Sequence, residues 1–300
     1  MLLFDAVVSI AAASTLRRHI ALCVAGEPRD IGRVPKRILA AAADLQQLAD
    51  LQRQHITVRV FASAHVRSEL AHMAARYLRS MNATAMELYD AGPSECVQEL
   101  NKPHSCQPDK RSCSFLMQFE GIRRSFALME AYERSQGLRF DYVVRFRFDI
   151  LCSGWDQLAR VIHSPHPTFL GAARSWPSQR LGPLDFSDMA WISSRAAATP
   201  LMTAVDEYGT RGCGELMSSS LLRKRCDVLG RPQCTSKRGD LLGCKYFECI
   251  LLVRLKAALP TTTFLNVAGN QSQRQWVCRK ALPDVHSDAA ISTRMLQNEY

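Results

Sequence analysis

Three charged residues stand on alternate positions at the end of an apolar stretch. The stretch FDYVVRFRFDI, residues 140–150, carries Arg145, Arg147 and Asp149. Because residues two apart in a strand share a face, the three charges are expected to project together. A carboxylate flanked by guanidinium groups suits a phosphate held partly through a divalent cation. Asp149 would bind the cation, and the arginines would pair with phosphate oxygens or hold the carboxylate. The alternative is an internal salt-bridge ladder without a ligand.

Strand-like and helix-like segments alternate along most of the chain and would position these charges. A short β-like run, residues 20–24, ends in residues that break strands, and a segment rich in Ala, Leu and Gln follows with helical spacing. Strands are predicted at 20–24, 56–64, 83–90, 140–150, 168–171, 189–194 and 261–269. Helices are predicted at 36–54, 66–81, 115–136, 155–161, 195–208 and 246–259, and a long loop at 91–114. This order predicts a single α/β domain with a mostly parallel central sheet flanked by helices.

The domain boundaries follow from the same reading. We expect a poorly defined N-terminal segment at 1–19, the α/β domain at 20–270 and a C-terminal tail at 271–300.

In an open α/β sheet, ligands bind outside the carboxyl ends of the parallel strands. The loop AGEPRD, residues 25–30, leaves the first strand at that edge, and Arg145, Arg147 and Asp149 stand toward the end of a later strand. The two segments are therefore expected to lie close together.

The order of these pieces resembles a group of glycosyltransferase-like proteins. The pieces are ALCVAGEPR, a strand ending VFASA, the helical MQFEGIRRSFALMEAYE, FDYVVRFRFDI, and DMAWISSRAAATPLMTAVDEY. The pattern of that group is a first strand ending in G-x-P-R, a helix before Y-D-x-V-x-R-x-R-x-D, and a later Asp followed by a strand and a helix. The motif stands here at residues 140–149, with an extra Tyr, and the resemblance covers residues 20–259.

The resemblance implies a GT-A-like, Rossmann-like fold and transfer of a sugar from a nucleotide-sugar donor, the co-substrate, to a glycan, protein or lipid acceptor. The positions that match the donor-binding pattern are Gly26, Pro28, Arg29, Arg145, Arg147 and Asp149. Asp149 would also bind the metal, Mn²⁺ or Mg²⁺. Arg147 stands where the common D-x-D form has its first acid, so the arginines could also neutralise the diphosphate without a cation.

A carboxylate near the acceptor hydroxyl is needed if the anomeric centre inverts. Asp188 matches the later acid of the pattern, and Asp185 and Glu248 are the other candidates. Asp188 or Asp185 would reach the edge that holds Asp149 only if the strand at 189–194 runs antiparallel to its neighbours. The alternative for each acid is a helix cap or a surface carboxylate.

Composition narrows the function classes. A formal net charge of +10 favours an anionic partner, but no basic-aromatic surface motif supports nucleic acid. The sequence also lacks the motifs of P-loop nucleotidases, Rossmann dehydrogenases, serine hydrolases and zincins. A noncatalytic carbohydrate- or anion-binding protein that keeps the fold is the alternative to a transferase.

Cysteine usage and sequons favour a secretory route. The chain has 11 cysteines, five of them between 213 and 249, and two glycosylation sequons, at Asn82 and Asn270. These features predict an oxidising compartment, the Golgi lumen, with the cytoplasm as the alternative. The apolar start carries Asp5 and lacks a basic n-region, so we expect no membrane-spanning segment there.

Overall fold

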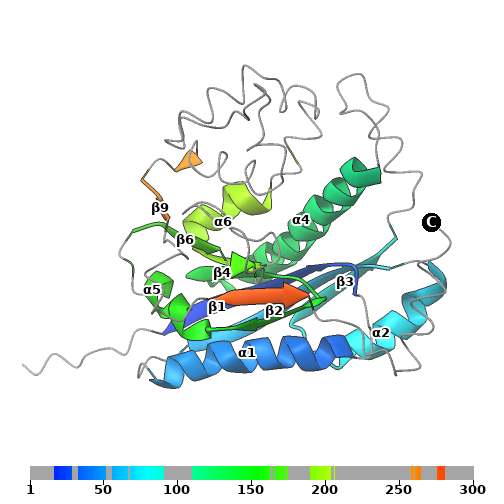
Figure 1. Ribbon diagram of the computed structural model, residues 1–300, viewed down its shortest axis with the longest axis horizontal. Helices are drawn as coiled ribbons and strands as arrows, with labels where there is room; N and C mark the ends of the chain where they lie inside the picture. The colour runs from blue at the N-terminus through cyan, green and yellow to red at the C-terminus, as the bar shows by residue number, and fades with distance from the viewer. Residues whose placement is uncertain are drawn as a thin grey trace, which may run out of the picture.

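The computed structural model contains a seven-stranded, mostly parallel sheet with helices on both faces (Figure 1). It describes residues 17–28, 33–51, 56–66, 68–90, 110–162, 164, 166–171, 173–174, 190–203, 206, 258–259, 261–264 and 276–280. The strands, in spatial order, are β3 (Ala85–Tyr89), β2 (Ile56–His65), β1 (Arg18–Gly26), β4 (Tyr142–Phe146), β8 (Ala190–Ser194), β6 (Thr168–Gly171) and β9 (Thr263–Phe264). Only β8 is antiparallel to its two neighbours. The predicted α/β class with a mostly parallel sheet is confirmed.

Two helical layers cover the sheet. One face packs against α1 (Val34–Leu51), α2 (Ala71–Arg79), η3 (Trp155–Leu158) and α5 (Ala159–Ile162), and the other against α4 (Lys110–Gln136) and α6 (Arg195–Met202). A short 3₁₀ turn, η2 (Ser68–Leu70), precedes α2. Figure 1 shows α1 and α2 below the sheet and α4 and α6 above it. Among the helices that the structure describes, none is long and apolar enough to cross a membrane.

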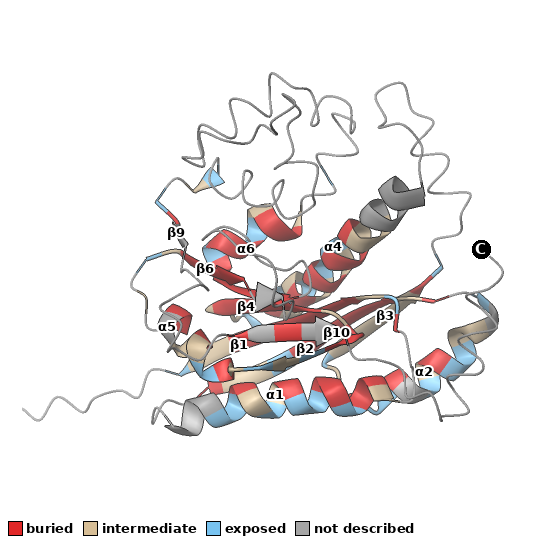
Figure 2. Cartoon of the chain, viewed as in Figure 1, coloured by how far each residue is buried: buried red, intermediate tan, exposed pale blue. Residues whose placement is uncertain are grey.

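The central strand β1 is buried on both faces. Its side chains alternate between the two cores: Ile20, Leu22 and Val24 pack on the α1 side, and Ala21, Cys23 and Ala25 on the α4 side. A parallel strand covered by helices on both faces needs apolar residues at every position, which explains the continuous run IALCVA. Figure 2 shows the buried residues concentrated in the sheet and on the sheet-facing side of α1.

An ion-pair network ties α4, α6 and β4 together at the amino edge of the sheet. Arg195, the first residue of α6, donates from Nε to Glu133 Oε1 at 3.0 Å and from Nη2 to Glu133 Oε2 at 2.9 Å. Glu133 also accepts a hydrogen bond from the backbone N–H of Phe140 at 2.9 Å. Asp141 accepts one from the backbone N–H of His19 at 2.7 Å, and its carbonyl accepts one from the backbone N–H of Arg195 at 2.8 Å. Phe140 and Asp141, the first two residues of the 140–149 motif, therefore have a structural role, because their hydrogen bonds connect the start of β4 to α4, β1 and α6.

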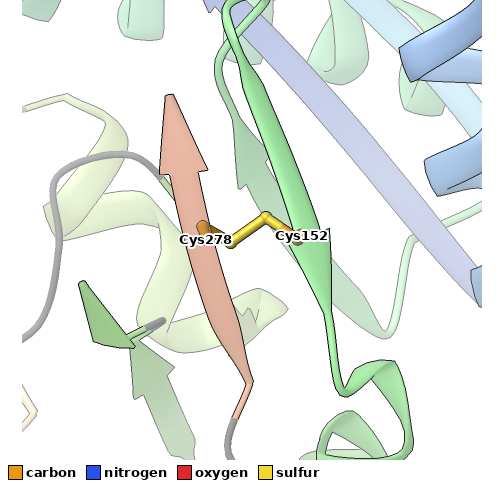
Figure 3. The surroundings of a disulfide bond; sticks show 2 residues. All are labelled: Cys152 and Cys278. Carbon is orange, nitrogen blue, oxygen red and sulfur yellow. A yellow bond between two sulfur atoms is a disulfide. The ribbon is translucent and has the colours of Figure 1, made fainter. Parts of the chain in front are cut away.

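A second, three-stranded sheet follows directly after β4. It consists of β5 (Ile150–Ser153), β10 (Val277–Lys280) and β7 (Ala173–Arg174), in the order β5-β10-β7. A disulfide joins Cys152 on β5 to Cys278 on β10 across 126 residues of sequence (Figure 3). The strand β10 lies within residues 271–300, which the sequence assigns to a tail, and the domain boundaries themselves stay a prediction.

The strand predicted at 140–150 is shorter than expected. β4 ends at Phe146, residues 148–149 form a turn, and Ile150 begins β5 of the second sheet. The physical reason is that Ile150 pairs with Lys280 of β10 in the second sheet, while Phe148 and Ile150 stay fully buried in the same core cluster as Phe146. The long helix also begins earlier than predicted, at Lys110 rather than at 115. Most of the predicted loop at 91–114 and of the predicted helix at 246–259 lies outside the described residues.

Candidate functional site

The strands β1 and β4 flank the point at which the strand order reverses. From β1 the chain proceeds to β2 and β3 on one side, and β4 lies on the other side of β1. β1 and β4 run parallel, with Val24 opposite Phe146, so both end at the same edge of the sheet. In open α/β sheets such a switch point, at the carboxyl ends of the strands, is where ligands bind. The segments that begin at Gly26 and Arg147 leave the sheet there.

Arg147 and Asp149 form a bidentate ion pair just beyond β4. Arg147 Nε donates to Asp149 Oδ1 at 2.8 Å, and Arg147 Nη2 donates to Asp149 Oδ2 at 2.8 Å. The Asp149 side chain is 7% exposed and that of Arg147 18%. Fork-to-fork geometry of this kind fixes both side chains. The structure thus brings these two predicted site residues together, with Arg147 the more accessible partner.

Arg145 does not share the position of this pair. It is fully buried within β4, between Cys23 of β1 and Trp191 of β8, on the face that α4 and α6 cover. Its Nη1 donates to the backbone carbonyl of Phe146. The three charges therefore do not stand on one continuous strand as predicted, because β4 ends at Phe146 and residues 148–149 form a turn. The charge of Arg145 acts on a neighbouring buried group. Burial raises the pKa of the Cys23 thiol, and the positive charge of Arg145 opposes that rise.

The first strand delivers Gly26 and Pro28 to the same edge. Gly26 has φ +125°, a backbone conformation that side chains other than hydrogen rarely adopt, and Pro28 is buried. The helix α4 approaches this turn closely, because a Cβ at Gly121 would lie 3.5 Å from Gly26 N and 2.8 Å from Tyr89 Oη. Gly121 thus lets α4 press against the end of β1. A glycine in the middle of a helix signals such a close approach in the sequence.

Three polar residues at this edge, His65, Tyr89 and Asp90, were not predicted as site residues. His65 ends β2 and Tyr89 ends β3, and their rings lie 5.6 Å apart. Tyr89 Oη donates to the carbonyl of Met117 at 3.2 Å, and Asp90 Oδ2 accepts a hydrogen bond from the backbone N–H of Ser68 at 3.1 Å. Burial raises the pKa of Tyr89, the neighbouring Glu120 adds to the rise, and Arg124 opposes it. The strand-end rule, applied to β2 and β3 as well, would have found these residues.

Four predicted site residues, Arg29, Asp185, Asp188 and Glu248, lie outside the described residues. The condition set for Asp188 and Asp185 is met, because β8 is antiparallel to β4 and its first residue, Ala190, pairs with Phe146. The strand β8 therefore begins at the edge of the sheet where β4 ends. The roles of the four residues stay predictions.

The described residues do not fit a divalent cation. Mg²⁺ takes oxygen ligands in near-octahedral geometry and is usually held through one or two carboxylates. Both oxygens of Asp149 accept hydrogen bonds from Arg147. Within the part of the chain that the structure describes, no three His, Cys, Asp or Glu residues group together as a metal site. Arg147 provides the positive charge next to Asp149 that a cation would otherwise supply.

Comparisons with known proteins returned solved structures alone. No protein-family model matches the chain, and no curated protein does. The chain is similar to a glycosyltransferase involved in glycosylation of the major capsid of PBCV-1, with 6% identity over 93% of this chain and 98% of that one, and a TM-score of 0.35. It is similar to galactosyltransferase LgtC in complex with donor and acceptor sugar analogues, with 11% identity, 93% and 95% coverage, and a TM-score of 0.33.

A third structure is glucosyl-3-phosphoglycerate synthase from Mycobacterium tuberculosis in complex with Mn²⁺, UDP and phosphoglyceric acid. It shares 13% identity with the chain over 66% of each, with a TM-score of 0.30. All these TM-scores lie below 0.5, and the proposals below rest on the geometry of the chain itself.

Proposed function

We propose that the chain is a glycosyltransferase that takes a sugar from a nucleotide-sugar donor and passes it to a glycan, protein or lipid acceptor. The observation that carries the proposal is the position of the Arg147–Asp149 pair. It lies directly beyond β4, at the edge of the sheet where Gly26 ends β1. An arginine held in a fixed orientation next to a strand switch point suits a diphosphate.

A second feature of the same edge favours an anionic ligand. The helix α1 begins at Val34, shortly after β1 ends, and no acidic residue lies in its first turn. Helix N-termini carry partial positive charge and favour phosphate groups. The formal net charge of +10 acts in the same direction over a longer range. The donor diphosphate would therefore lie between the start of α1 and Arg147.

The chemistry requires three contributions. The bond between the anomeric carbon and the diphosphate oxygen breaks, a bond from that carbon to the acceptor oxygen forms, and positive charge must stabilise the leaving diphosphate. In our proposal Arg147 supplies that charge and Asp149 holds the guanidinium in place, while the buried Arg145 adds positive charge from within β4 without contact to the donor. If the anomeric centre inverts, Asp188, or else Asp185 or Glu248, takes the proton from the acceptor hydroxyl. Gly26, Pro28 and Arg29 bind the nucleotide side of the donor.

The cofactor that the resemblance implies is Mn²⁺ or Mg²⁺. Because the described residues do not form a site for either, we assign the neutralising role to arginine and expect transfer without added metal. A divalent cation would have to share Asp149 with Arg147 and take further ligands from outside the described residues. Turnover that is unchanged by a chelator supports the arginine assignment, and turnover that requires Mn²⁺ or Mg²⁺ contradicts it.

The experiment that tests the function measures nucleotide release. Pure protein is incubated with UDP- and GDP-linked sugars, with and without Mn²⁺, across a panel of glycan, peptide and lipid acceptors. Release of UDP or GDP that depends on the acceptor, and that falls at least about a hundredfold in Asp188→Ala, is the expected result, since a lost general base costs two to four orders of magnitude. The function is wrong if no donor is bound or consumed.

A noncatalytic carbohydrate- or anion-binding protein is the second candidate. It is favoured by one observation, which is that both oxygens of Asp149 are occupied by Arg147. A protein that binds a nucleotide sugar, but releases no nucleotide with any acceptor or cation, would support this candidate over the transferase.

We further propose that the chain works in the secretory pathway, in the Golgi lumen. The Cys152–Cys278 disulfide supports an oxidising compartment. A cytoplasmic location is the alternative, and the location of the full chain expressed without an added secretion signal would separate the two.

A further inference from the structure

Asn82 occupies an exposed turn between α2 and β3. It has φ +53°, the only positive φ of a non-glycine residue among the described residues, and its backbone N–H donates to the carbonyl of Arg79 at 3.4 Å. Asn tolerates this left-handed conformation better than most residues, and helices often end with such a residue. Thr84, two residues later, is also exposed, and its backbone N–H donates to the carbonyl of Val60 at 2.8 Å. The Asn-Ala-Thr sequon is therefore a surface turn fixed at both ends.

We propose that Asn82 carries an N-linked glycan. The acceptor pattern Asn-x-Ser/Thr requires a surface position in a chain that enters the secretory pathway, and the turn supplies that position. In the transfer step the Asn82 amide nitrogen forms a bond to the anomeric carbon of an oligosaccharide diphosphate lipid. The bond from that carbon to the diphosphate breaks, the diphosphate lipid leaves, and the amide proton is released to solvent.

The position of the turn is compatible with a bulky glycan. Asn82 lies at the amino end of β3, whereas the Arg147–Asp149 pair lies beyond the carboxyl end of β4, with β2 and β1 between the two strands. A glycan on Asn82 would therefore not obstruct the candidate site. It would instead cover the neighbourhood of an edge strand, since β3 is the first strand of the sheet and four of its five residues are only partly buried. Edge strands are commonly protected against pairing with other chains.

The disulfide gives independent support for the route. Cys152 and Cys278 are bonded across two strands of the second sheet, far from Asn82 in the sequence. Disulfides persist in the same compartments in which N-linked glycans are added. Two unrelated chemical features, an exposed sequon and a cross-strand disulfide, thus favour the same route.

The test uses the full chain made in eukaryotic cells behind a cleavable secretion signal, with Asn270→Gln present throughout so that one sequon remains. Both the secreted and the retained protein are collected, because the glycan is added on entry to the lumen. The measurements are the gel shift on treatment with peptide N-glycosidase and the mass of the peptide that contains residue 82. Thr84→Ala removes the sequon and Thr84→Ser keeps it, while Asn82→Gly removes the acceptor and still allows the positive φ.

The expected result is one glycan on the parent and on Thr84→Ser, and none on Thr84→Ala or Asn82→Gly. Thermal unfolding of the deglycosylated proteins checks that all four retain the fold. An unmodified Asn82 in the parent protein, in both the secreted and the retained pools, would overturn the proposal. A glycan that survives in Thr84→Ala would overturn it equally. Neither result bears on whether the chain transfers a sugar.

Discussion

Arg147 reaches back to Asp149 across a turn and donates both Nε and Nη2 to its two carboxylate oxygens, each at 2.8 Å. The pair forms at the point where β4 leaves the main sheet and the chain enters the second one. A carboxylate in this position resembles a metal ligand in the sequence. In the structure it orients an arginine instead, and this relationship underlies the proposed cation-independent stabilisation of a diphosphate.

The pair should also stabilise the fold. Arg147→Ala leaves the buried Asp149 carboxylate without its partner and should lower the free energy of unfolding by about 3 kcal/mol. In a double-mutant cycle with Asp149→Asn, measured by urea unfolding, we expect a coupling energy of at least about 1 kcal/mol. The exposed pair Arg123–Asp206, with Nε–Oδ1 at 2.7 Å, is the control and should couple by less than about 1 kcal/mol. Equal coupling in both pairs would contradict the buried role of the first.

The close approach of α4 to the end of β1 should depend on Gly121. In Gly121→Ala the new methyl group would lie 2.8 Å from Tyr89 Oη, which should cost about 1–3 kcal/mol of overpacking and exceed the roughly 1 kcal/mol gained in helix propensity. In a Tyr89→Phe background the obstructing hydroxyl is gone, so Gly121→Ala should become neutral or stabilising. Thermal and urea unfolding of the four proteins check this. A Gly121→Ala effect that is the same in both backgrounds would show that the hydroxyl is not the obstacle.

The disulfide should stabilise the second sheet, because it joins β5, the strand that follows Asp149, to β10. It closes a loop of 126 residues, so the double variant Cys152→Ala/Cys278→Ala should lose about 2–5 kcal/mol in the free energy of unfolding, measured without reductant. Addition of reductant should then destabilise the parent protein more than the double variant. The prediction fails if the double variant is as stable as the parent.

Stability above neutral pH should depend on Cys23. Burial raises the pKa of this thiol, and because the folded protein then binds the proton more tightly than the unfolded chain, the stabilisation is present at neutral pH and is lost above the unfolded thiol pKa of about 8.5. The difference in the free energy of unfolding between the parent and Cys23→Ala should therefore shrink by about 1.4 kcal/mol per pH unit above that value. Comparison with Cys23→Ala isolates this thiol from Tyr89, whose pKa is also raised. A difference that is constant between pH 7 and 10 would contradict the prediction.

The main sheet was predictable because its strands are covered on both faces. The run of β1 is apolar from Ile20 to Ala25, β2 is buried from Val60 to Ala64, and the helix α1 between them shows a helical period, so local patterns suffice. The resemblance assigned Arg147 and Asp149 to the same donor-binding site, and the structure brings the two side chains into contact. The antiparallel direction of β8, stated only as a condition, could not be derived from its own five residues.

The end of β4 was not predictable from the local pattern. In the run from Phe146 to Ile150, apolar and charged residues alternate as they would in a continuing strand. The structure instead divides this run between two sheets, because Ile150 pairs with Lys280 of β10, 130 positions along the chain from it by residue number. Pairing at such separation leaves no periodic signal near the turn. The burial of Arg145 has a different origin, because the residue lies in β4 between β1 and β8 of the main sheet.

Binding of nucleotide sugars tests the central claim most directly. Calorimetric titration of UDP- and GDP-linked sugars should show binding of at least one of them to the parent protein. Affinity should fall at least about tenfold in Arg147→Gln, equivalent to about 1.4 kcal/mol. Arg134→Gln, which removes the same charge from the exposed last turn of α4 near the opposite edge of the sheet, should leave binding unchanged. Failure of the parent to bind either nucleotide sugar, or equal binding by the two variants, would contradict the account.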